Sequence, residues 1–86
     1  MKHETMTAET TIYEGDLEIT ARGWYEWERG DESTGIPDGY ELDEWEIIDI
    51  NQDGQPLDYT HFKEYEHVFS FEIIEALSSI SDYDLK

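Results

Sequence analysis

The feature that most constrains the fold is an alternation of apolar and polar side chains between Asp16 and Glu28. A period of two is typical of a β-strand with one buried side, because successive side chains point to opposite faces. We therefore predict a strand over residues 16–28. Its core side is expected to carry Leu17, Ile19, Ala21, Gly23, Tyr25 and Trp27. Trp24 falls on the polar side, and we interpret it as a shield for a neighbouring strand, with an exposed anchor for a partner as the alternative.

A second strand is predicted over residues 40–50 (YELDEWEIIDI). Simple alternation places its apolar residues on both faces, so the strand is expected to be covered on both sides along its second half. One face would carry Leu42, Ile48 and Ile50, and the other Trp45 and Ile47. A turn over residues 51–54 follows, since Asp-Gly supplies the positive φ that tight hairpins need. A shorter strand is predicted over residues 10–13, and residues 29–39, which include an RGD tripeptide, are expected to form a loop.

The last third of the chain changes to a helical period. Asp58 is expected to cap a short helix that extends through Glu66 and carries Phe62 and Tyr65 inward. Ser70 is expected to cap a second helix, with a short strand over residues 66–71 as the alternative. In that second helix Ile73, Ile74, Leu77 and Ile80 recur at helical spacing.

These elements predict an α+β fold, in which a small antiparallel sheet of three or so strands packs against a C-terminal helix. The 86 residues are expected to form a single domain, with residues 1–8 and 81–86 as loose ends. Aromatic residues make up 14% of the chain, which argues against disorder. The chain contains no cysteine, and its first residues lack the apolar segment of a signal peptide. We therefore expect a cytoplasmic protein with no membrane contact.

Charge is the most unusual property of the composition. The chain holds 23 acidic and 5 basic residues, which gives a formal charge of −18. Twelve of the carboxylates lie between Glu26 and Asp58, where Arg29 is the one basic residue. Repulsion among so many like charges lowers the stability of a compact state, and solubility needs only about 2–8 excess charges. Three explanations remain: a high-salt habitat, a cation-binding role, or a partner with a strongly basic surface.

Asp49, Asn51 and Asp53, followed by a glycine, match the opening of an EF-hand calcium loop. The second half of that motif fails, because Thr60 stands where a bidentate glutamate belongs and Pro56 interrupts the loop. We therefore expect a strand-ending turn, with a weak calcium site as the alternative. The sequence contains no phosphate-binding glycine loop, zinc motif or recognisable nucleophile. We therefore expect neither enzymatic activity nor a cofactor, with a hydrolase that uses paired carboxylates as the alternative, against which a chain of this length leaves little room for a substrate cleft.

The overall outline resembles a group of small, acidic, bacteriophage-encoded proteins of unknown role. The pieces that carry this resemblance are the Gly23-Trp24-Tyr25 run, the Gly/Pro loop over residues 35–39, the acidic strand that ends in isoleucines, Asp53-Gly54 with Leu57-Asp58, and the segment 70–80. The matching positions are turn and core residues, so the resemblance implies a fold and a viral origin and transfers no catalytic residue. The acidity is similar to that of inhibitor proteins that mimic DNA.

Regularly spaced carboxylates on rigid strands suggest what such a surface could bind. Neighbours on one face of a strand are about 6.6 Å apart, a step similar to that between phosphates of a nucleic acid. We therefore expect a phage-type inhibitor that mimics nucleic acid, acts in the host cytoplasm and binds the basic surface of a host defence protein or nuclease, as anti-CRISPR and anti-restriction proteins do. It would not bind nucleic acid itself, and its oligomeric state is left open. The alternative is a viral structural or assembly accessory protein with an acidic docking surface. The residues expected to bind the partner are Trp24, Glu26, Glu28, Glu41, Asp43, Glu44, Trp45 and Glu46.

Overall fold

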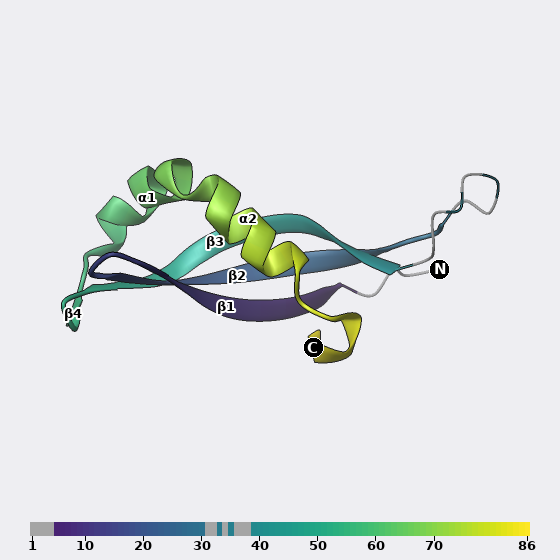
Figure 1. Ribbon diagram of the computed structural model, residues 1–86, viewed down its shortest axis with the longest axis horizontal. Coiled ribbons are helices and arrows are strands. Elements are labelled where there is room, and N and C mark those ends of the chain that lie inside the picture. Colours follow the sequence, from purple (N-terminus) through teal and green to yellow (C-terminus); the bar gives the residue numbers. More distant parts are fainter. Residues whose placement is uncertain (1–4, 31–32, 34, 36–38) are drawn as a thin grey trace.

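The computed structural model describes residues 5–30, 33, 35 and 39–86. They form a four-stranded antiparallel sheet in the order β1-β2-β3-β4, with two short helices lying across one face (Figure 1). The predicted α+β fold is confirmed. The strands are β1 (Met6–Glu14), β2 (Leu17–Glu28), β3 (Gly39–Gln52) and β4 (Gln55–Pro56). The helices are α1 (Phe62–Val68) and α2 (Ser70–Ser78), accompanied by the 3₁₀ turns Tyr59–His61 and Asp82–Asp84.

The central strand β2 forms the sheet side of the core, and its predicted alternation is confirmed from Leu17 to Tyr25, whereas Trp27 at its end is 42% exposed and lies outside the core. Ile19, Ala21 and Tyr25 are buried on the face that the helices cover. They pack in one cluster with Ile73 and Leu77 of α2, both of which are fully buried. The Tyr25 hydroxyl reaches across this interface and donates a hydrogen bond of 2.7 Å to the Leu77 carbonyl oxygen. Burial of apolar surface and this hydrogen bond together hold α2 on the sheet.

Strand β3 does not have apolar residues on alternate faces, because two β-bulges change the phase of its side chains. Asp43 and Ile48 each lack a partner on β2 at a shift in the register. As a result Leu42 pairs with Tyr25, and Ile47 with Ala21, on the helix-covered face. An extra residue moves all following side chains to the opposite face, so the apolar residues end up together. The prediction of a strand covered on both sides is therefore wrong. The apolar residues on the helix-covered face are Leu42, Trp45, Ile47 and Ile50.

The predicted turn between β3 and β4 is confirmed. Asp53 and Gly54 both have positive φ, of 51° and 80°, as a two-residue hairpin turn with matching twist requires. The backbone N–H of Asp53 also donates to the carbonyl oxygen of Asp16 in the neighbouring β1–β2 turn, at 3.1 Å. The two hairpin ends are thereby tied together.

The first helical segment begins as the sequence predicts. The Asp58 carboxylate accepts a hydrogen bond from the Thr60 backbone N–H at the start of the 3₁₀ turn that leads into α1. Phe62 and Tyr65 of α1 pack against the core. Residues 66–71 are helical apart from a break at Phe69, so the alternative of a strand there is wrong.

Ser70 does not cap α2, which corrects the second capping prediction. Its hydroxyl donates to the carbonyl oxygen of His67, and no side chain caps the helix. The Phe69 N–H donates to Tyr65, and the Phe69 carbonyl accepts from Ile73, so the backbone bonding of α1 continues into α2. The preceding helix thus provides the acceptor for the N–H of the N-cap residue, Phe69, where no side chain caps the helix.

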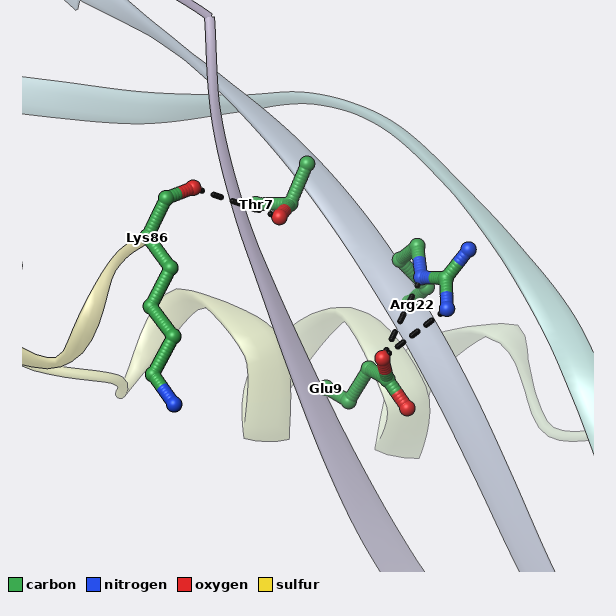
Figure 2. Close-up of polar contacts among 4 residues, drawn as sticks. All are labelled: Thr7, Glu9, Arg22 and Lys86. Carbon is green, nitrogen blue, oxygen red and sulfur yellow. Dashed lines mark hydrogen bonds and ion pairs between the residues drawn. The ribbon is translucent and has the colours of Figure 1, made fainter.

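The described parts of the predicted loose ends are ordered against each other. Met6–Ala8 belong to β1, and Leu85 is buried in the core. The backbones of Thr7 and Lys86 exchange two hydrogen bonds of 2.7 and 2.8 Å, and the Thr7 hydroxyl adds a third at 3.2 Å (Figure 2). The prediction of a loose tail over residues 81–86 is therefore wrong, because one buried leucine and one edge pairing fix it. Residues 1–4 lie outside the described residues, as do 31–32, 34 and 36–38 of the predicted loop.

Candidate functional site

The side of the sheet that the helices leave uncovered is termed the open face. Residues paired directly across antiparallel strands point to the same side, so the register defines this face. β2 contributes Glu18, Thr20, Arg22, Trp24, Glu26 and Glu28. β1 contributes Thr7, Glu9, Thr11 and Tyr13, and β3 contributes Glu41, Glu44, Glu46, Asp49 and Asn51.

Eight carboxylates lie on the open face, and all eight residues are exposed. Neighbours along one strand are spaced by about 6.6 Å, and adjacent strands are separated by about 4.8 Å. The charges are therefore held in a two-dimensional array by a hydrogen-bonded backbone. The eight are Glu9, Glu18, Glu26, Glu28, Glu41, Glu44, Glu46 and Asp49.

The single basic residue of this face, Arg22, is engaged by Glu9 of the neighbouring strand. Its Nη2 lies 2.9 Å and its Nε 3.3 Å from Glu9 Oε2 (Figure 2). This pair partly neutralises the β1–β2 side of the face. The other carboxylates that β2 and β3 contribute to the open face have no further basic residue beside them among the face residues defined above.

Two acids of the open face are placed directly opposite each other. Glu26 of β2 pairs in register with Glu41 of β3. Directly opposed residues have Cβ atoms about 4.5–5.5 Å apart, and like charges at such positions destabilise a sheet. The arrangement therefore costs folding free energy that a neutral or mixed-charge pair would not.

The structure brings together six of the eight residues predicted to bind a partner. The residues that share the open face are the half-buried Trp24 and the five glutamates Glu26, Glu28, Glu41, Glu44 and Glu46. Asp43 is exposed at a bulge, and Trp45 lies on the opposite, helix-covered face. Sequence reasoning could not place these two, because the bulges that decide their orientation have no marker in composition. It also omitted Glu9, Glu18 and Asp49 from the set, although the last two follow from alternation once the pairing is known.

The calcium-like segment is part of a β-hairpin and not of a helix–loop–helix. The Asn51 side-chain amide donates to the Asp49 carboxylate at 3.1 Å, while Asp53 lies in the turn. Two of the three candidate ligands are thus bonded to each other. Within the residues that the structure describes, no group of three or more acidic or histidine side chains converges in the manner of a metal site.

A groove of about 500 Å³ lies on the other side of the sheet, between β3 and α2. Its apolar lining comes from Tyr40, Leu42, Trp45, Ile74 and Ile80, and three carboxylate residues also line it: Glu41, Asp43 and Asp82. Tyr25 lies at its inner end, where burial raises the pKa of the phenol above its ordinary value of 10.0.

Two further observations concern membrane-spanning helices and similarity to known proteins. No helix among the described residues is both long and apolar enough to cross a membrane. Comparison of the chain with protein families, with curated proteins and with solved structures finds no match.

Proposed function

We propose that this protein is a stoichiometric inhibitor that mimics nucleic acid, with the open face as its binding surface. The observation that carries the proposal is the array of eight exposed carboxylates on one face of a rigid sheet. Proteins that bind DNA or RNA meet a regular array of negative charge with lysine and arginine side chains. A surface with carboxylates at similar spacing fits the same basic groove.

The cost of the charge array supports a functional origin for it. Glu26 and Glu41 face each other across two strands, where a neutral pair would be more stable. A surface that served solubility alone would not need this juxtaposition, because solubility requires a much smaller net charge. The half-buried Trp24 lies between these acids and Arg22 along β2 and offers an aromatic contact.

The proposed mechanism is competition without chemistry. Long-range attraction between the open face and a basic groove accelerates association, and the bound inhibitor then excludes nucleic acid. By the resemblance to phage proteins, the target would be a host defence protein or nuclease, such as a CRISPR effector or a restriction enzyme. The protein itself would bind no nucleic acid, because its field repels phosphate.

The proposal is tested with a charge reversal and a control of equal charge. The immobilised wild-type protein captures partners from a bacterial lysate, and duplex DNA or RNA is then added as competitor. The Glu44→Lys/Glu46→Lys variant changes two residues of the open face, whereas Glu64→Lys/Glu75→Lys makes the same charge change on the helices. We expect the first variant to lose the captured partner and the second to retain most of it.

Salt provides a second measure. Wild-type affinity should fall steeply between about 50 and 200 mM salt, and the slope should be smaller for the open-face variant. Equal binding by the two double variants would contradict the proposal. So would a captured partner that neither DNA nor RNA displaces.

A further inference from the structure

The groove between β3 and α2 continues into an exposed apolar surface. Ile74, which lines the groove, remains 41% exposed. Phe71 is 73% exposed and lies three residues earlier, on the same side of α2. Exposed large apolar side chains beside a concave site indicate a contact surface, above all in a chain with a charge of −18. This surface lies on the other side of the sheet from the open face, and the two meet at Glu41 on the edge of β3.

The outer edge of β3 forms one side of this groove. Among the described residues, β4 pairs with β3 at Asn51 and Gln52 and leaves the rest of that edge without a neighbouring strand. The Tyr40 backbone N–H donates to Asp82 Oδ2 at 3.5 Å, and the Ile47 N–H donates to Glu66 Oε2 at 3.2 Å. Side chains thus satisfy the edge donors at these two positions.

The backbone groups between Tyr40 and Ile47 remain available for pairing. Alternation along the strand, corrected for the bulge at Asp43, directs the N–H groups of Leu42 and Trp45 outward, as it does those of Tyr40 and Ile47. Residues 41–46 span roughly 20 Å, which matches a strand of ordinary length. Along this edge the N–H groups of Tyr40 and Ile47 are bonded to side chains, and those of Leu42 and Trp45 between them are available to a partner strand.

We propose that this groove binds an extended, basic segment of a partner protein, which adds to the sheet as a strand beside residues 41–46 of β3. In such strand addition, backbone hydrogen bonds give affinity and pockets for alternate side chains give specificity. One set of alternate side chains is apolar and enters the groove against Leu42, Trp45 and Ile74. The other set points to the opposite side of the sheet, where Glu41, Glu44 and Glu46 of β3 favour lysine or arginine in the segment.

A second copy of this chain is a poor occupant of the same site. Pairing two β3 edges would bring Glu41, Asp43 and Glu44 of each copy close together, and like charges oppose such a contact. The bulge also limits how far a long ladder can extend, which is one way proteins prevent edge-to-edge assembly. A short cationic segment is not repelled by these carboxylates and needs no long ladder.

The test uses a blocked six-residue peptide of alternating lysine and valine. Two further peptides carry backbone N-methyl groups, one on the lysines and one on the valines, which removes the N–H donors of one edge or the other. We expect the parent peptide to bind and to protect the amides of Leu42 and Trp45 from hydrogen exchange. One methylated peptide should bind at least about tenfold more weakly, and the other about as well as the parent. Equal binding of all three, or no protection of these amides by the parent peptide, overturns the proposal.

A pair of protein variants separates groove binding from simple charge attraction. Ile74→Asp adds a negative charge inside the groove, and Val68→Asp adds the same charge on α1, at a residue that is 58% exposed and outside the groove. Charge attraction alone would strengthen binding of the basic peptide to both variants. We expect Ile74→Asp to weaken it at least about tenfold and Val68→Asp not to weaken it. Undiminished binding to Ile74→Asp would contradict the proposal, and neither result depends on the function proposed for the open face.

Discussion

The two faces of β2 differ in both burial and charge. Ile19 is fully buried beneath the helices, whereas Glu18, the adjacent residue, is exposed on the open face. The helix-covered face joins Ile19, Ala21 and Tyr25 to α2 in one core. The open face carries carboxylates, among them the opposed pair Glu26 and Glu41. One strand thus combines a side that stabilises the fold with a side that reduces its stability.

This division has a physical consequence for how the molecule tolerates its charge. Repulsion on the open face acts across a sheet whose other side is fixed by apolar contacts and by the Tyr25–Leu77 hydrogen bond. The backbone hydrogen bonds of β2 with both β1 and β3 keep the carboxylates in register. The core therefore allows the open face to keep an arrangement that an isolated hairpin would not hold.

The largest difference between the faces should appear on truncation of adjacent residues. Ile19→Ala is expected to lower the free energy of unfolding by about 2–5 kcal/mol, because it leaves a cavity in the core. Glu18→Ala should change it by less than about 0.5 kcal/mol. Urea unfolding followed by tryptophan fluorescence measures both. Similar losses for the two variants would show that the faces are not energetically distinct.

A smaller effect is expected where the helices are tied to the sheet. Tyr25→Phe removes the hydrogen bond to the Leu77 carbonyl oxygen and should cost about 0.5–1.5 kcal/mol at neutral pH. Burial holds the pKa of Tyr25 above 10.0 in the folded state, so folding favours the neutral phenol. Its contribution is complete below pH 10 and is lost as the pH rises through the raised folded-state pKa.

The contribution of the Tyr25 hydroxyl at each pH is obtained from the difference in stability between the wild-type protein and the Tyr25→Phe variant. Unfolding midpoints measured from pH 8 upward should converge above pH 10, as the wild-type protein loses an advantage that Tyr25→Phe lacks. A constant difference across this range would contradict the assignment of the shift to Tyr25.

The smallest expected effect has the opposite sign. Glu41→Lys converts the opposed acids into an ion pair and should raise the free energy of unfolding by about 0.2–1 kcal/mol. The same variant should weaken partner binding if the open face acts as proposed. In a Glu26→Gln background most of the stability gain should disappear. A gain that persists there would reflect net charge alone and not the opposed pair.

The sequence was sufficient to predict the elements whose pattern is local. Alternation along β2, the Asp53-Gly54 turn and the Asp58 cap depend on neighbouring residues, and the structure confirms all three. The inward positions of Phe62 and Tyr65 follow from helical spacing and are also confirmed.

Features that depend on distant partners could not be predicted. The register with β2 decides where β3 has its bulges, and so decides that Trp45 lies under the helices. Leu85 is a lone apolar residue in a polar tail and has no periodic neighbours to mark it. For the candidate site, alternation grouped Glu26 with Glu28 and Glu44 with Glu46, but only the strand pairing joins these pairs into one array with Glu9 and Asp49.

The two bulges of β3 are positions at which the strand can lose one residue and keep the identity of each face. Each bulge reverses which residues of the alternation face the helices. Between Asp43 and Ile48 the even-numbered residues lie on the open face, whereas in both flanks the odd-numbered residues do. Deletion of Asp43, the unpaired residue, would place Leu42 next to Glu44, and simple alternation would then keep Leu42 toward the helices and Glu41 on the open face. Loss of a single codon at either bulge would therefore leave the chemistry of both surfaces in place.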